Sequence, residues 1–320
     1  MDPSRLGVRP NLFIVGAGKA GTYTLYAHLR KHPDVFMSAK KEPNYFGSDL
    51  QFRPQRIRED QYLALFGDAG GKRYRGEASV SYLLSRTAAS EIRAYSPDAK
   101  IIIIVRNPIE VLQARHTQNL ITGVENIRRL DRALAAEAHR RLGKRVPMET
   151  PVIDWLYYRE WVKFSEQIRR YQQCFPKEQI FIGVYDDLKR DSTSFYRSVL
   201  EFLDLPIHSP KQLAQVNPRL RIRSYLLHRL LKNRTPALAR LSRILIPSHF
   251  VRGAIHSALS KANVSPDTQK EQRGISPALR HRLQGELAGE VLALGELLDR
   301  DLSHWLKATT PVGPQGPDPD

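Results

Sequence analysis

Short apolar runs without alternation stand at three places along the chain. They fall within residues 11–18 (Asn-Leu-Phe-Ile-Val-Gly-Ala-Gly), 100–105 (Lys-Ile-Ile-Ile-Ile-Val) and 179–185 (Gln-Ile-Phe-Ile-Gly-Val-Tyr). A strand that is covered on both faces is apolar at successive positions, whereas a half-exposed strand alternates. The three runs therefore predict buried strands of a parallel sheet.

Apolar residues at helical spacing fill the intervals between these runs. The predicted helices cover residues 22–31, 85–95, 108–121, 127–142, 153–174, 192–203 and 277–306. Strands that alternate with helices favour a parallel sheet with helices on both faces. We therefore expect an α/β protein with a three-layer, P-loop-like fold and a central parallel sheet of about five strands.

The length of 320 residues allows one large α/β domain. We predict an N-terminal extension over residues 1–10, the domain itself over 11–306, and a disordered tail rich in Pro and Gly over 307–320. Residues 205–266 stand apart as a basic helical insertion. This segment has eleven Lys or Arg, no Asp or Glu, and leucines at helical spacing.

The net charge and the cysteine content limit which binding partners and which cellular compartment we expect. The net charge of +17 indicates an anionic partner, which is a nucleotide, an acidic glycan, a nucleic acid or a membrane surface. The single cysteine, Cys174, excludes a disulfide within the chain and suits a reducing compartment. No signal peptide pattern and no run near the roughly 18 apolar residues of a spanning helix is present in the sequence. We expect a cytoplasmic protein, with contact of 205–266 to an anionic membrane or an acidic glycan as open alternatives.

The segment Gly16-Ala-Gly-Lys-Ala-Gly-Thr22 joins the first predicted strand to the first helix. Glycines let the backbone fold around an oxyanion, and amides at a helix start point toward it. Lys19 adds a positive charge, while Thr22 and Thr24 add hydroxyl donors. An ATPase loop needs Lys directly before Ser or Thr to seat magnesium, but Gly21 precedes Thr22 here. The pattern predicts a phosphate site without the usual magnesium seat.

Arg106 ends the second strand, in the segment Arg106-Asn-Pro108. Arginine binds an anion bidentately and without a metal. Because ligands of open sheets bind at the carboxyl ends of the strands, we expect the Lys19 loop and Arg106 to lie together. Two separate cationic contacts suit a nucleotide with phosphates at its 5′ and 3′ positions. The histidines show no metal-binding spacing, and no metal is expected.

These motifs resemble those of the sulfotransferases that use 3′-phosphoadenosine 5′-phosphosulfate (PAPS). Residues 16–25 resemble the 5′-phosphosulfate loop, and residues 101–110 resemble the 3′-phosphate segment. The segments 40–46 (Lys-Lys-Glu-Pro-Asn-Tyr-Phe) and 76–82 (Gly-Glu-Ala-Ser-Val-Ser-Tyr) resemble the carbohydrate and heparan branch. The resemblance implies a bacterial-type enzyme that transfers a sulfuryl group from PAPS to a hydroxyl or amine of an unidentified acceptor, with carbohydrate or lipid as candidates.

The resemblance also implies the nucleotide contacts. The residues that would bind the 5′-phosphosulfate are Lys19, Ala20, Gly21, Thr22, Tyr23 and Thr24. Arg106 would bind the 3′-phosphate. The family usually places a serine eight residues after that arginine, where this chain has Ala114. Tyr23 likewise stands where Thr or Ser is commoner.

Three residues are candidates for catalysis. Lys19 would neutralise the leaving phosphate, and Glu77 would act as the base that deprotonates the acceptor. By resemblance, Lys41 would lie beside the sulfuryl group or the acceptor. Glu42 either pairs with a neighbour or shares the base role. His116 either touches the ligands or is structural.

Two other functions fit parts of the sequence. A P-loop kinase of a small molecule shares the strand, loop and helix opening but needs a lysine beside Thr22 and a magnesium carboxylate. Nucleotide binding that depends on magnesium would indicate the kinase rather than the sulfotransferase. A basic protein that binds a membrane or nucleic acid through 205–266 is the other alternative, although no specific nucleic acid is expected. Salt-dependent pelleting with liposomes would test it.

Overall fold

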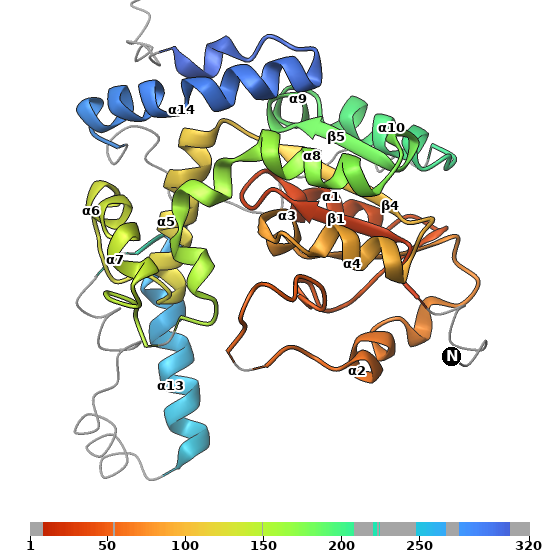
Figure 1. Cartoon of the computed structure of the whole chain (residues 1–320). Coiled ribbons are helices and arrows are strands. Elements are labelled where there is room, and N and C mark those ends of the chain that lie inside the picture. Colours follow the sequence, from red (N-terminus) through yellow and green to blue (C-terminus); the bar gives the residue numbers. More distant parts are fainter. Residues whose placement is uncertain are drawn as a thin grey trace, which may run out of the picture.

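The computed structural model describes residues 9–53, 55–148, 150–207, 220–222, 224, 248–266 and 275–307. Its centre is a parallel sheet of five strands in the order β2-β3-β1-β4-β5 (Figure 1). The strands are β1 (Leu12–Gly16), β2 (Val35–Met37), β3 (Tyr74–Ala78), β4 (Lys100–Val105) and β5 (Ile180–Val184). The predicted α/β fold with about five parallel strands is confirmed.

The core follows the apolar runs of the sequence. Strand β1 occupies the middle of the sheet, where Leu12 pairs with Gly76 on one side and Lys100 on the other. All residues of β1 are buried, as are residues 101–105 of β4. Because β1 and β4 are adjacent parallel strands, both end at the same edge of the sheet, with the residues that follow them side by side.

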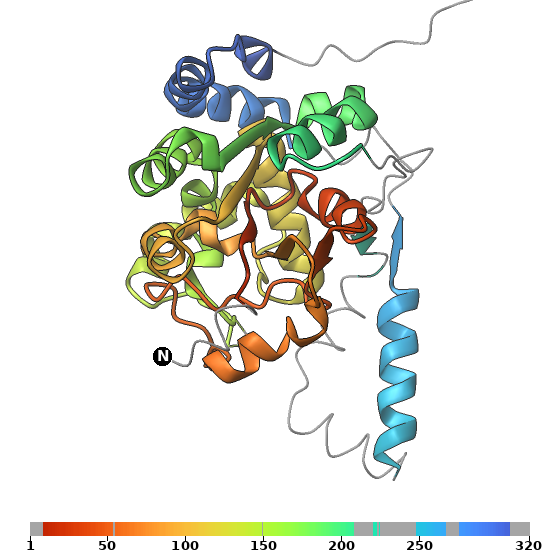
Figure 2. The same ribbon diagram turned by 90° about the vertical axis from the view of Figure 1, so that its right-hand side faces the viewer.

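Helices cover both faces of the sheet (Figure 2). Helices α1 (Thr22–Leu29) and α10 (Ser192–Phe202) lie on one face, where the His28 and Tyr196 rings are 6.1 Å apart. On the other face, α3 (Ser81–Leu84) and α4 (Ala88–Tyr95) pack against α8 (Phe164–Cys174). Helix α5 (Pro108–Thr122) follows β4, and α14 (Pro277–Leu298) packs against α5 and α8.

The remaining elements are short. The helices are α2 (Glu59–Ala64), α6 (Leu130–Ala135), α7 (Glu137–Arg141) and α9 (Tyr185–Arg190). The 3-10 helices are η2 (Gly67–Ala69), η3 (Ile153–Leu156), η4 (Tyr158–Val162), η5 (Lys177–Gln179) and η6 (Ser303–Leu306).

Three predicted helices differ from the structure. The predicted helix 277–306 ends at Leu298 as α14, and η6 forms separately over Ser303–Leu306. The predicted helix 127–142 is divided into α6 and α7. Only the second half of 153–174 is α-helical, because 153–162 forms η3 and η4. This first half is rich in aromatic and β-branched residues, which have modest helix propensity. Its Tyr158 and Trp161 side chains are buried instead against other parts of the domain.

The basic segment 205–266 is described only in part. It contains the antiparallel pair β6 (Leu220–Ile222) and β7 (Val264–Pro266), and α13 (His249–Ala262), which extends away from the sheet in both views (Figures 1 and 2). The predicted helical leucines at 226–245 lie outside the described residues, as do 1–8 and 308–320. Within the described ranges, no helix is long and apolar enough to span a bilayer.

Candidate functional site

The loop between β1 and α1 is fixed by its backbone geometry. Gly21 precedes α1 with φ +88°, and a Cβ there would lie 2.6 Å from Leu188 Cδ2, so this position requires glycine. Lys19 also has a left-handed backbone, with φ +69°. The first amides of a helix have no partner within the helix and attract anions. The start of α1 carries no acidic residue that would compete.

The predicted 5′-phosphosulfate residues occupy this loop and the first turn of α1. Ala20 is buried and its methyl side chain has no polar atom, so only its backbone could bind an anion. Thr22 is buried and Thr24 is half-buried. The exposed Tyr23 ring packs against Tyr26, at 6.1 Å between ring centroids. The structure brings these residues together, while their contacts to a ligand stay predictions.

The Lys19 side chain lies among other cations. Its Nζ atom donates to Gln118 Oε1 of α5 at 3.3 Å. Burial lowers the pKa of Lys19, and the positive charges of Arg115, Arg106 and Lys41 lower it further. Positive charges that converge in a partly buried place repel one another unless an anion binds between them. The electrostatics of this site therefore suit a polyanion.

Arg106 joins the end of β4 to the loop. Its Nη1 atom donates to the carbonyl oxygen of Lys19 at 2.8 Å, which confirms that the two lie together. Its guanidinium also covers the Tyr185 ring at 4.4 Å from the centroid. The adjacent Asn107 side chain caps α5, because it accepts hydrogen bonds from backbone amides of the first turn. Asn107 Nδ2 also donates to the carbonyl oxygen of Trp305 at 3.2 Å.

Ala114 is half-buried on α5. The two residues that follow it, Arg115 and His116, have different surroundings. The His116 ring nitrogen Nε2 lies 2.8 Å from the carbonyl oxygen of Ile127, and the ring packs on Tyr158 at 5.7 Å. Burial lowers the pKa of His116. These contacts give His116 a structural position. Arg115 is buried beside two tryptophans and has an arrangement of its own, described below.

Lys41 and Glu42 form an ion pair at the edge of the site. Lys41 Nζ is 2.8 Å from Glu42 Oε1, and the backbone amide of Val80 donates to Glu42 Oε2 at 3.3 Å. The exposed fraction of the side chain is 19% for Lys41 and 33% for Glu42. Lys40 is exposed, so the two adjacent lysines point in different directions. Glu42 is thus a carboxylate that solvent and ligands can reach.

Glu77 lies inside the protein, on β3. Its carboxylate accepts hydrogen bonds from the hydroxyl groups of Tyr62 (2.6 Å), Ser79 (2.7 Å) and Tyr82 (2.8 Å). Burial raises the pKa of Glu77 to about 7, although these hydroxyls oppose the shift. The side chain has no exposed surface. This geometry does not support the prediction that Glu77 contacts the acceptor, because the carboxylate is sealed and already has three donors.

The hydroxyls bound to Glu77 continue into the segment that follows Glu42. Ser79 Oγ accepts the amide of Asn44 at 3.2 Å, and the Tyr82 hydroxyl accepts those of Tyr45 and Phe46 at 2.9 and 3.3 Å. The Ser79 and Tyr82 hydroxyls thus donate to the carboxylate and accept from the backbone. Glu77 therefore braces residues 44–46, which follow the Lys41–Glu42 pair.

The fold and the site together define the class of protein. A glycine-rich loop follows the central strand of a parallel sheet, and cations from neighbouring strand ends converge on it. This is a P-loop-like protein whose site suits a phosphorylated, anionic ligand.

Comparison with known proteins identifies the family. The sulfotransferase domain matches residues 9–225, and the chain belongs to this family of transferases. It is similar to heparan sulfate glucosamine 3-O-sulfotransferase 3B1 of Homo sapiens, with 32% identity over 35% of this chain and 27% of the relative. Carbohydrate sulfotransferase 15 of Mus musculus is 29% identical over 34% of this chain and 27% of the relative. The chain spans about a quarter of the length of these curated relatives.

A solved structure extends the likeness over almost the whole chain. The sulfotransferase from Alicyclobacillus acidocaldarius superimposes with a TM-score of 0.66 and 26% identity, covering 93% of this chain and 99% of that one. The domain match ends at residue 225, whereas the Asn107–Trp305 hydrogen bond places η6 beside the turn that follows Arg106.

Proposed function

We propose that the chain transfers a sulfuryl group from PAPS to a hydroxyl or amine group without a metal. The observation that carries this proposal is the hydrogen bond between Arg106 Nη1 and the Lys19 carbonyl, which joins the two predicted phosphate-binding segments at adjacent strand ends. The relatives that are named for heparan sulfate and carbohydrate favour a carbohydrate acceptor over a lipid.

The donor nucleotide would use the cations of the site. The amides at the start of α1 and the Lys19 ammonium would bind the 5′-phosphosulfate. Arg106 would bind the 3′-phosphate with its planar guanidinium. Lys19 then neutralises the charge that develops on the leaving phosphate. The lowered pKa of Lys19 reflects the burial and crowding of cations that such an anion would relieve.

The base in this proposal is Glu42. It is a partly exposed carboxylate beside Lys41, whereas Glu77 is sealed and holds the neighbouring backbone. Glu42 takes the proton from the acceptor hydroxyl as its oxygen attacks sulfur. The bond between sulfur and the 5′-phosphate oxygen breaks in the same step. The products are the sulfated acceptor and adenosine 3′,5′-bisphosphate.

The test is release of adenosine 3′,5′-bisphosphate from labelled PAPS in the presence of a panel of acceptors. The panel includes glucosaminyl oligosaccharides, simple amines and hydroxylated lipids. Lys19→Ala should lower turnover roughly 10²–10³-fold, the effect of removing one donor to the transition state. The matched control is Lys40→Ala, since Lys40 is an exposed lysine on the neighbouring segment. Near-normal turnover in Lys19→Ala would refute the assignment of the loop.

We also propose that helix α13 contacts the surface of an anionic membrane. It exposes Phe250, Val251, Ile255 and Leu259, and Phe250 retains 78% of its surface. The surrounding segment 205–266 contains eleven basic and no acidic residues. A helix with exposed apolar groups in a basic segment suits the interface of an anionic bilayer. Pelleting with phosphatidylserine vesicles should decrease in high salt and in Phe250→Ser.

A further inference from the structure

Arg115 carries a buried positive charge without a polar partner. Its guanidinium lies 3.7 Å from the centroid of the Trp161 ring and 5.1 Å from that of Trp155. Within the described part of the chain, no hydrogen bond or ion pair reaches this guanidinium, and its Nε atom is sealed from solvent. Burial lowers the pKa of Arg115 to about 10. Stacking on rings compensates part of the cost of burying such a charge. The N–H donors remain available.

The surroundings place Arg115 beside the Lys19 loop. Trp161 touches this loop, because a Cβ on Gly18 would lie only 3.2 Å from Trp161 Cζ3. Gln118, about one helical turn after Arg115 on α5, accepts the hydrogen bond from Lys19 Nζ. Two different contacts therefore join the Arg115 environment to the predicted 5′-phosphosulfate loop.

Electrostatic neighbours agree with this placement. Of the three cations that lower the pKa of Lys19, Arg115 has the largest effect, ahead of Arg106 and Lys41. Glu42 is the carboxylate that acts on Arg115. Arg115 is thus coupled electrostatically both to the lysine proposed to neutralise the leaving phosphate and to the proposed base.

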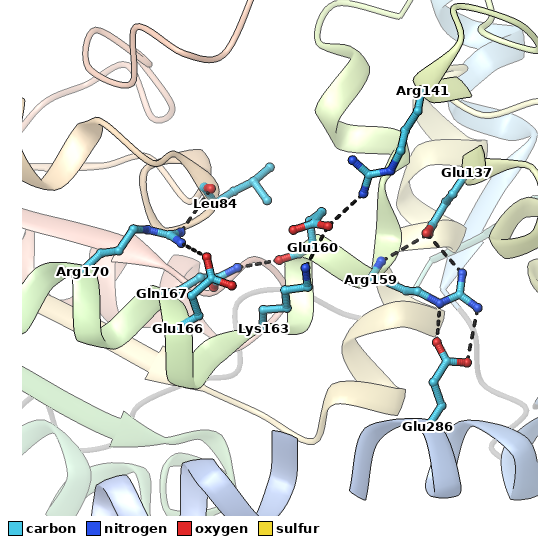
Figure 3. Close-up of polar contacts among 10 residues, drawn as sticks. All are labelled: Leu84, Glu137, Arg141, Arg159, Glu160, Lys163, Glu166, Gln167, Arg170 and Glu286. Carbon is cyan, nitrogen blue, oxygen red and sulfur yellow. Dashed lines mark hydrogen bonds and ion pairs between the residues drawn. The ribbon is translucent and has the colours of Figure 1, made fainter. Parts of the chain in front are cut away.

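The segment that carries Trp161 is held firmly (Figure 3). The guanidinium of Arg159 pairs with Glu286 and with Glu137, the latter at 3.1 Å. The Glu160 carboxylate accepts hydrogen bonds from Arg141 at 2.9 Å and Lys163 at 3.0 Å. These ion pairs anchor the residues directly before Trp161 and the lysine two residues after it. Because Arg115 stacks on a ring of this anchored segment, its guanidinium is positioned as transition-state stabilisation requires.

We propose that Arg115 is a catalytic residue that binds the non-bridging oxygens of the sulfuryl group during its transfer. The inference rests on the proposed function, because the sulfuryl group passes between the Lys19 loop and Glu42 only in that reaction. A planar guanidinium suits two oxygens of one tetrahedral group. By analogy with phosphoryl transfer, these oxygens carry the spread charge of the transition state. Arg115 forms no bond to sulfur and keeps its proton throughout.

Two nucleotides distinguish a sulfuryl contact from a phosphate contact. PAPS carries the sulfuryl group, and adenosine 3′,5′-bisphosphate lacks it. Arg115→Met should weaken PAPS binding by roughly tenfold or more, which is the loss of charged hydrogen bonds. It should leave binding of the bisphosphate within twofold, and it should lower turnover of PAPS roughly 10²-fold. Calorimetry and bisphosphate release give the three values.

The matched control is Arg93→Met. Arg93 is a half-buried arginine that lies over the Phe175 ring, 5.7 Å from its centroid, away from the site. It should bind both nucleotides as the wild type does. If Arg115→Met does not fold, Arg115→Lys keeps the charge and removes the planar fork, and it should show the same selective loss with a smaller size.

Four results would overturn the inference. Equal loss of affinity for both nucleotides would place Arg115 at a phosphate instead. A lower melting temperature with unchanged affinities and turnover would reduce Arg115 to packing on the tryptophans. A wild-type protein that binds neither nucleotide would refute the proposed function itself, and the inference with it. Wild-type binding of both nucleotides with no effect of Arg115 variants would refute the inference alone.

Discussion

The guanidinium of Arg106 is paired with the carboxylate of Glu110, about one turn further along α5. Arg106 Nε and Nη2 lie 2.9 and 2.5 Å from Glu110 Oε2. This carboxylate occupies two of the donors that a 3′-phosphate needs, and its charge repels the phosphate. In the proposed function, binding of the 3′-phosphate therefore requires Arg106 to exchange the Glu110 carboxylate for the phosphate.

The exchange predicts that Glu110→Gln tightens the binding of adenosine 3′,5′-bisphosphate. We expect a gain of several-fold to tenfold, roughly 1 kcal/mol for removing one competing charge at a partly exposed site. Calorimetry at constant salt measures it. Glu166→Gln is the control, because Glu166 forms the same i, i+4 pair with Arg170 at 2.8 Å but away from the site. Weaker binding in Glu110→Gln would mean that Glu110 positions Arg106.

Ala114→Ser should also tighten the binding of the bisphosphate. Ala114 stands where the resembling family carries a serine, and a hydroxyl that donates to a phosphate contributes roughly 1.5–3 kcal/mol. Arg115 stacks on Trp161 near the Lys19 loop, so we expect that it does not contact the 3′-phosphate. The gain should therefore be the same with or without Arg115→Met. A gain that appears only after Arg115 is removed would show that Arg115 already binds the 3′-phosphate.

Glu42→Gln should lower turnover roughly 10²–10⁴-fold while nucleotide binding stays unchanged, because the variant keeps the shape of the side chain but loses its basicity. Glu77→Gln should have a smaller effect on turnover and raise the KM for the acceptor, since it loosens residues 44–46. Initial rates at varied acceptor concentration separate the two. A larger loss of turnover in Glu77→Gln, at unchanged melting temperature, would return the base role to Glu77.

Glu77 should make the stability of the protein depend on pH. Its pKa of about 7 in the folded state exceeds the value of 4.5 for an unperturbed glutamate, so folding favours the protonated form. The stabilisation is fully present below pH 4.5 and is lost as pH rises through 7, by up to roughly 3 kcal/mol. Urea unfolding at pH 5, 6, 7 and 8 should show this decline in the wild type and a flatter profile in Glu77→Gln. Parallel profiles for both proteins would contradict the prediction.

The sequence predicted the strands that are apolar throughout and missed those that are not. Strands β1, β4 and β5 correspond to the three apolar runs. Strand β2 has only three residues, which is too short for a pattern. Strand β3 reads Tyr-Arg-Gly-Glu-Ala, with two charged residues inside the sheet. Glu77 is tolerated there because three hydroxyls bind it, and those hydroxyls come from separate elements.

The site was predictable as a set of segments but not as a set of contacts. The glycine loop and Arg106 follow strands, and their proximity came from the topology of a parallel sheet. The partners of Arg115 did not follow from any local pattern. Trp155 and Trp161 lie forty or more residues further along the chain, in a segment predicted as plain helix. Likewise, the sequence made both Glu77 and Glu42 candidates for the base. Only the structure shows that Glu77 is fully buried while Glu42 is partly exposed.

The Asn107–Trp305 hydrogen bond connects the turn after β4 to the last described element, η6. Trp305 Nε1 also donates to Asp186 Oδ2 at 2.7 Å, and Arg300 pairs with Asp187. A ribosome makes Arg300 and Trp305 about two hundred residues after Asn107. The five strands of the sheet and the glycine loop are thus synthesised before the turn after Arg106 can form its hydrogen bond to Trp305. A chain cut short before residue 275 would therefore carry the glycine loop and Arg106 yet leave the turn after β4 without its hydrogen bond to Trp305.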